Sequence, residues 1–249
     1  NQTLDKFKEH LKKMRQYEQA VCLLNWDLQT MAPKKGVESK LETLGFFSTE
    51  SFKLSTSEEY GAMLQELSRP ELFAQLDEGM QLTVKRGLRD YQRFQRVPQD
   101  FYTDYVTTSA RSEKMWEEAK RAGDFSLFSP WLDKMISMTR QYVGYMEPEK
   151  DAYEVLLDMY EEGMDSATID RIFDEMKEGL LPLLSKIAAA GMPDLSALEG
   201  HYDIDAQKKV QNMLLSYIGF DFDGGAVAES EHPFTMAYAM GYPDHEPLS

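Results

Sequence analysis

Apolar residues recur at steps of three and four along most of this chain, which is the spacing of one face of an α-helix. The first such stripe runs from Leu4 to Leu24, with Lys and Glu opposite. Prolines and glycines separate the later stripes, among them Pro70, Pro98 and Gly123. The pattern predicts an all-α fold of about eight to ten helices, forming one elongated domain over residues 1–240.

The segment from Gly219 to Thr235 departs from this pattern, and we expect it to be irregular or extended. It holds two glycine turns and then His232, which Pro233 follows directly. Because proline fixes its own φ and restricts the residue before it, His232 should be presented from a rigid backbone. Residue type alone leaves two interpretations open, a buried structural histidine in a loop corner and part of a working site.

Composition narrows the classes of partner. A chain of 249 residues with 42% hydrophobic content can bury a full core. Its formal charge of −16 argues against nucleic acid and against an anionic membrane surface, which both attract clustered Lys and Arg. No apolar run approaches the roughly 18 residues of a membrane span. The single cysteine, Cys22, cannot form an internal disulfide, so a cytoplasmic location is the default expectation.

Several chemically conspicuous residues have ordinary interpretations. Trp26 and Asp27 are consistent with a core aromatic and a local helix cap. Asp158 lies in a predicted helix, where isolated acids are common on the solvated face. The histidines, His10, His201, His232 and His245, are too dispersed to predict a metal site. From residue types alone we therefore assign no catalytic residue and no metal ligand.

Four motifs, taken together and in order, resemble the carboxypeptidase Taq family of metallocarboxypeptidases. They are the Trp-Asp block of residues 23–36, the Phe-x-x-Phe-x-Pro run of residues 125–130, the Leu-Leu-Asp-x-Tyr-Glu-x-Gly-Met block of residues 156–164, and the His-Pro-Phe triplet of residues 232–234. The resemblance extends over about residues 10 to 240. Glu154 and Ala228 are departures, since aspartate is usual at both places.

The resemblance implies an all-helical fold like the N-terminal half of neurolysin or angiotensin-converting enzyme. It also implies a zinc or cobalt enzyme that removes single residues from the free C-terminus of peptides. By this resemblance His232, Pro233 and Phe234 line the substrate side of a cleft. Four further motif residues would be structural; they are Trp26, Asp27, Asp158 and Tyr160.

The His-Glu-x-x-His motif that holds the metal in that family is absent from this sequence. His245-Glu246 begins like it, but Pro247 breaks helices and Ser249 occupies the fifth position. The resemblance places the zinc helix after the His-Pro-Phe block. We therefore expect an N-terminal half that is inactive alone and holds no cofactor.

The last nine residues, 241–249, do not match the Asp-x-Arg-Ile-Thr block that the resemblance leads us to expect. One set of codons for them, read one base later, encodes Asp-Thr-Arg-Ile-Thr-Asn-His-Tyr. We therefore predict an aberrant tail and hypothesise a frameshift near Gly241. Deliberate truncation and a naturally short relative remain alternatives.

A second function class competes with the peptidase interpretation. A helical half-domain would expose apolar surface, which soluble monomers rarely tolerate in large patches. The chain could thus be a noncatalytic interaction module that self-associates or pairs with a separate C-terminal half. Peptidase activity requires metal and is sensitive to a chelator, whereas an interaction module requires neither.

Overall fold

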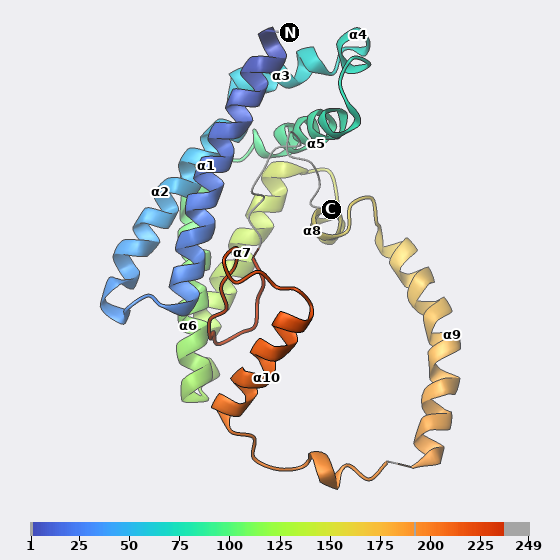
Figure 1. Cartoon of the computed structure of the whole chain (residues 1–249). Coiled ribbons are helices and arrows are strands. Elements are labelled where there is room, and N and C mark those ends of the chain that lie inside the picture. Colours follow the sequence, from blue (N-terminus) through green and yellow to red (C-terminus); the bar gives the residue numbers. More distant parts are fainter. Residues whose placement is uncertain (1, 192, 237–249) are drawn as a thin grey trace. The chain divides into compact units, whose positions relative to one another are not determined.

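A computed structural model describes residues 2–191 and 193–236 of the chain. Within these ranges every regular element is helical, which confirms the all-α prediction (Figure 1). The α-helices are α1 (Gln2–Thr30), α2 (Val37–Ser55), α3 (Glu58–Leu67), α4 (Pro70–Phe73), α5 (Glu78–Phe94), α6 (Gln99–Ala122), α7 (Ser129–Met146), α8 (Ala152–Tyr160), α9 (Ser166–Ala190) and α10 (Ile204–Tyr217). Three short 3-10 helices are η1 (Lys34–Gly36), η2 (Phe125–Leu127) and η3 (Ser196–Leu198).

Most helix boundaries lie at the residues that the sequence marks. Ser57, Asp77 and Asp165 each accept a hydrogen bond from a backbone N–H of the first turn that follows, which caps α3, α5 and α9. Pro98 stands at the start of α6, and Gly123 follows its last residue. Local chemistry is therefore sufficient to start and stop these helices.

The chain divides into two compact units, each described by itself. The first comprises Asn1–Leu156 together with the segment that begins at Ser230, and the second is Leu157–Glu229. The predicted domain limit at residue 240 and the predicted aberrant tail lie outside the described residues, so both stay predictions.

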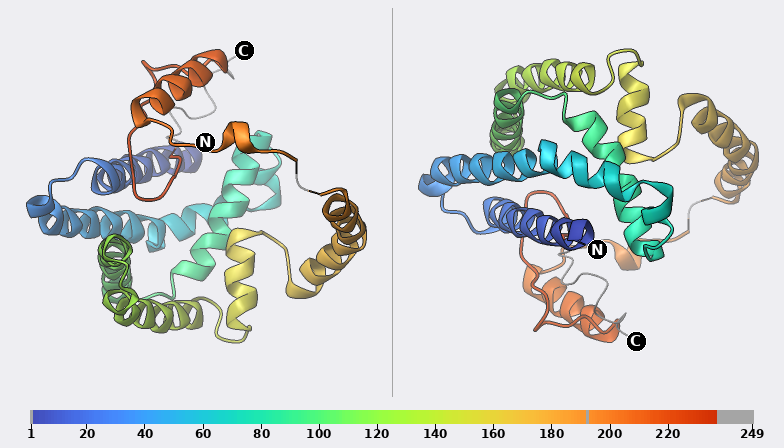
Figure 2. Two further views of the ribbon diagram at one scale, coloured as in Figure 1. Left: turned by 90° about the horizontal axis from the view of Figure 1, so that it is seen from below. Right: turned by 90° about the horizontal axis from the view of Figure 1, so that it is seen from above.

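The first unit is built on an antiparallel pair, α1 and α2, which lie side by side (Figure 2). Helix α6 packs against α2, and α7 packs against α6. One buried cluster joins α1, α3 and α5 around Phe7 and Leu64, both of which have no exposed surface. A second cluster joins α2 to α6 and α7, and its Phe52 and Tyr102 rings stack with centroids 3.9 Å apart. These cores make α6 a rigid platform.

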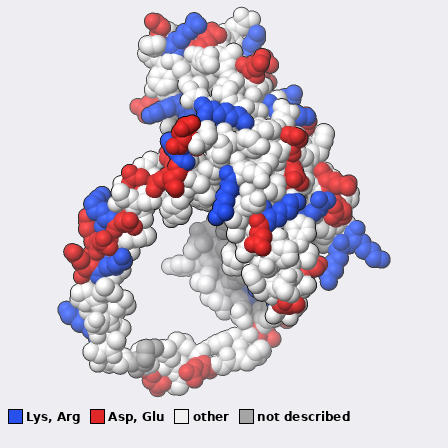
Figure 3. All heavy atoms as spheres, turned by 180° about the vertical axis from the view of Figure 1, so that it is seen from behind, with Lys and Arg blue, Asp and Glu red and all other residues white. Residues whose placement is uncertain are grey.

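The second unit holds α9 and α10, neither of which contains a buried residue. Large apolar side chains of α9 face solvent, including Phe173 at 47% exposure and Leu184 at 57%. On the face that Figure 3 displays, charged side chains gather over the first half of α9, and the second half is mostly uncharged. Among the described residues, no helix combines the length and apolarity needed to cross a bilayer.

Candidate functional site

The His-Pro-Phe triplet lies in a segment without helix or strand, as the sequence predicts. Ser230 Oγ donates to the His232 carbonyl at 2.7 Å, and His232 Nδ1 lies 2.8 Å from the Pro233 carbonyl oxygen. His232 and Pro233 are exposed, whereas Phe234 is half-buried. The interpretation of His232 as a buried structural histidine is therefore wrong, and its imidazole is accessible.

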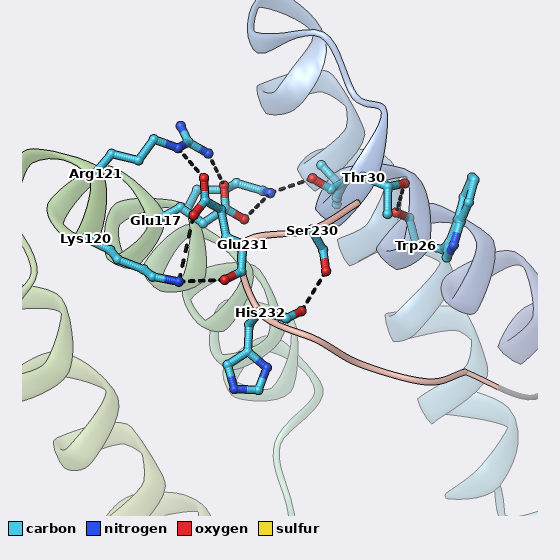
Figure 4. Close-up of polar contacts among 10 residues, drawn as sticks. Trp26, Thr30, Glu117, Lys120, Arg121, Ser230, Glu231 and His232 are labelled. Carbon is cyan, nitrogen blue, oxygen red and sulfur yellow. Dashed lines mark hydrogen bonds and ion pairs between the residues drawn. The ribbon is translucent and has the colours of Figure 1, made fainter. Parts of the chain in front are cut away.

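The residue before the triplet, Glu231, fastens this segment to the last turn of α6 (Figure 4). Arg121 Nε donates to Glu231 Oε1 at 2.7 Å. Lys120 Nζ donates to the backbone carbonyl of Glu231 at 2.6 Å and lies 3.8 Å from its Oε2. Because both the side chain and the main chain of Glu231 are held, the backbone that enters His232 is restrained.

One turn earlier on α6, Trp116 packs beside the imidazole of His232. The two rings meet edge to face, with centroids 6.2 Å apart and an angle of 63°. Lys120 Nζ lies 5.1 Å from the centroid of the Trp116 ring, a distance at which a cation is attracted to an aromatic face. Trp116 therefore supports both His232 and the lysine that holds the neighbouring carbonyl.

Trp116, Lys120, Arg121 and Glu231 form a clamp on the His-Pro-Phe segment. A fifth clamp residue, the buried carboxylate Glu117, connects it to the N-terminal motif block. Arg121 Nη2 donates to Glu117 Oε2 at 3.2 Å, and Lys114 Nζ donates to Glu117 Oε1 at 2.7 Å. Lys114 also donates to the carbonyl of Leu28 near the end of α1. Polar contacts thus run from α1 through α6 to Glu231 (Figure 4). Helix α6 therefore holds both the Trp-Asp block and the His-Pro-Phe segment, which are about 200 residues apart in the sequence.

Trp26 and Asp27 lie within α1, close to its end. Asp27 does not cap a helix, so that interpretation is wrong; it pairs with Lys40 of α2. Trp26 is only half-buried, and its carbonyl accepts a hydrogen bond from Thr30 Oγ1 at 2.6 Å. The pair with Lys40 ties α1 to α2, but the structural roles expected for Trp26 and Asp27 stay predictions.

Asp158 and Tyr160 lie in α8 and belong to the second unit. Asp158 Oδ1 accepts a hydrogen bond from the backbone N–H of Gly163 at 2.8 Å, across the turn that ends α8. Tyr160 is 85% exposed. Their structural roles also stay predictions.

Electrostatics at the clamp favour the charged forms of both partners. The hydrogen bond from Arg121 lowers the pKa of Glu231, and the same bond raises the pKa of Arg121. Nearby on α6, partial burial raises the pKa of Glu113, while Lys114 and His232 act in the opposite direction. At neutral pH the contact between Glu231 and Arg121 is a full ion pair.

Replacing Glu231 by Gln should loosen this segment. The pKa of Glu231 is lower in the folded chain than in an unfolded one, so its stabilising contact is fully present above the ordinary pKa of about 4.3. It is lost as the pH falls through the lowered pKa. At pH 7 we expect amides of residues 230–236 to exchange with deuterium up to about fivefold faster in E231Q, the scale of an exposed ion pair.

The matched control is Glu42→Gln, which removes one exposed charge from α2. The difference between parent and E231Q should shrink as the pH falls through the lowered pKa of Glu231, because the parent carboxylate then takes up a proton and loses its charge. Equal exchange in parent and E231Q at pH 7 would show that Glu231 does not hold the segment.

Sequence reasoning missed the clamp residues, which are Trp116, Glu117, Lys120, Arg121 and Glu231. Glu117 and Arg121 do show the four-residue spacing of a helical ion pair. Glu231, however, follows Arg121 by 110 positions, and no local pattern connects residues that far apart.

The described residues do not fit a catalytic metal centre. Among them, no group of three His, Cys, Asp or Glu side chains is placed to hold a metal ion. His245 and Glu246 lie outside the described residues.

Residues 6–241 match the family model of the carboxypeptidase Taq (M32) metallopeptidases. The chain belongs to this family. It is 34% identical to carboxypeptidase 1 of Bacillus subtilis over 94% of its own length and 47% of the relative's. It is 30% identical to thermostable carboxypeptidase 1 of Pyrococcus furiosus, over 96% of its own length and 48% of the relative's.

Solved structures agree with this M32 assignment. The crystal structure of BsuCP superposes with a TM-score of 0.89 at 33% identity, over 96% of this chain and 48% of that one. The Pyrococcus furiosus carboxypeptidase superposes with a TM-score of 0.73 at 27% identity, over the same shares of the two chains. The chain spans about half the length of the curated relatives it matches, and this is their N-terminal half.

Proposed function

We propose that this chain forms one wall of the peptide-binding cleft of a metal-dependent carboxypeptidase, which uses zinc or cobalt to release single C-terminal residues. The metal ligands belong to the remaining half that its relatives carry. The observation that supports this role most directly is the clamp on Glu231, which presents an exposed His232 from an immobilised backbone.

The restraint on His232 matters because a group that positions a substrate must already be held in place before the substrate binds. A displacement of about 1 Å can cost about 100-fold in rate. The donors from Lys120 and Arg121, together with the Trp116 ring, restrict the backbone and ring of His232. An imidazole held in this way can bind a peptide carbonyl or carboxylate with little loss of entropy.

The second unit supports pairing with a complementary half. The apolar side chains of α9 are exposed although they follow the spacing of a helix made for packing. Relatives contain about as much chain again as this one covers. We therefore infer that the complementary C-terminal half covers α9; self-association through the same face is the alternative that an interaction module would require.

The role of His232 can be tested in a fusion of residues 1–240 to the unmatched half of the Bacillus subtilis relative. His232→Ala should lower kcat/KM for an unblocked peptide by about 10- to 100-fold. The amount of bound metal should not change, because within the described ranges His232 belongs to no group of three side chains that could hold a metal ion.

The control for this experiment is His201→Ala, at an exposed histidine of the second unit. It should leave kcat/KM unchanged. Loss of metal in H232A would make His232 a ligand, and an unchanged kcat/KM would remove it from the cleft wall.

A further inference from the structure

A cavity of about 310 Å³ lies within the first unit, between α1, α2, α5, α6 and α7. This volume is at the small end of the range for ligand pockets, roughly 300–1,000 Å³. It is lined by Glu18, Val21, Cys22, Ser48, Ser51, Phe52, Ser55, Phe94, Tyr102 and Tyr142. None of these residues belongs to the His-Pro-Phe segment or to the clamp that holds it.

Aromatic rings form much of the cavity wall. Phe52 and Tyr102 stack at 3.9 Å between centroids, and Phe94 and Tyr142 stack at 6.3 Å. Burial raises the pKa of both tyrosines, so their phenols stay neutral at physiological pH. Neutral ring faces carry a negative quadrupole and attract cations.

Glu18 is the one charged residue among the ten that line the cavity. It is exposed, and its charge is the second cause, after burial, of the raised pKa of Tyr102. The Glu18 carboxylate is therefore near enough to the aromatic wall for its charge to act on the Tyr102 phenol. An anion would be repelled by Glu18 and by a chain of net charge −16, whereas a cation would be attracted by both.

We propose that this cavity binds a small organic cation, an ammonium group on a compact apolar body of about the size of benzylammonium. The ammonium group pairs with Glu18, and the apolar body lies against Phe52 and Tyr102. Serines of α2 line the same cavity, and their hydroxyl oxygens are able to accept hydrogen bonds from an ammonium group. This site is independent of the proposed peptidase role.

The chain provides its own reporter, because Cys22 is its single cysteine and lines the cavity. Benzylammonium should slow the alkylation of Cys22 by iodoacetamide in the folded 249-residue chain. The protection should reach a plateau as the benzylammonium concentration rises, as expected for a single site. Benzyl alcohol, its neutral analogue, should require about fivefold higher concentration, the scale of one exposed ion pair. Saturation-transfer NMR on the two compounds gives the same comparison without the thiol.

Two variants decide whether Glu18 and the cavity are responsible. Glu18→Gln should abolish the preference for the amine, and Glu9→Gln, an exposed acid of the same helix outside the cavity, should keep it. Ser51→Leu fills the cavity and should prevent binding. Equal binding of amine and alcohol, a preference that survives E18Q, binding that survives S51L, or no binding by either method would each overturn the proposal.

Discussion

A polypeptide of these 249 residues, supplied with zinc or cobalt, should release no C-terminal amino acid from an unblocked peptide in a chelator-sensitive reaction. The described residues contain no set of three ligands for a metal, and enzymatic peptide hydrolysis of this kind needs a metal to activate water and polarise the carbonyl. The fusion to the second half of the Bacillus subtilis relative should be active. We expect the two rates to differ by more than about 10⁴-fold.

The assay measures free amino acid released over time, with and without a chelator, for the chain, the fusion and an equimolar mixture of the two separate halves. Chelator-sensitive turnover by the chain alone would contradict the prediction. It would mean that the histidines, or residues outside the described ranges, assemble a metal site.

Sedimentation of the same three samples separates the two function classes. If the second half covers α9, the chain alone should self-associate and the mixture should form a one-to-one complex. If the chain self-associates but does not bind the second half, the result would favour the noncatalytic interaction module.

The second large effect is expected in the core, where α3 and α5 cross. A Cβ added at Gly61 would collide with the Tyr91 ring, and one added at Gly87 would lie 2.8 Å from the Tyr60 hydroxyl oxygen. Gly61→Ala should therefore lower the free energy of unfolding by about 2 kcal/mol, because overpacking a filled core forces its neighbours to move.

Gly144→Ala is the matched control, since Gly144 also lies inside a helix, α7, but has open space where the Cβ would be. It should raise the free energy of unfolding by about 0.5–1 kcal/mol, which is the usual gain in helix propensity. Urea unfolding followed by circular dichroism measures both variants. A stability of G61A equal to or above that of the parent would show that α3 and α5 do not pack this closely.

Acid should affect the clamp before it affects this core. Glu231 is an exposed carboxylate whose lowered pKa depends on Arg121, whereas Leu64 and Val84 are fully buried and carry no titratable group. Exchange of residues 230–236 is thus a more sensitive measure of the clamp than global unfolding.

The sequence by itself determined the helical class, most of the helix boundaries and the family. Helical spacing of apolar residues, capping side chains such as Ser57 and Asp165, and breakers such as Pro98 act within a few residues, so their effect can be read locally. The four motifs in their order led to the M32 family, which the family model and the relatives confirm. The irregular backbone of the segment that holds the His-Pro-Phe triplet was also predictable from the sequence.

Only the tertiary structure decided which side chains meet. Arg121 and Glu231 are 110 positions apart, and Asp27, taken for a cap, instead pairs with Lys40 on the neighbouring helix. Exposure of His232 was likewise undecided, because a histidine in a loop can be buried or accessible. Such contacts depend on how α1, α2 and α6 pack, and packing is set by the whole core and not by any short stretch of sequence.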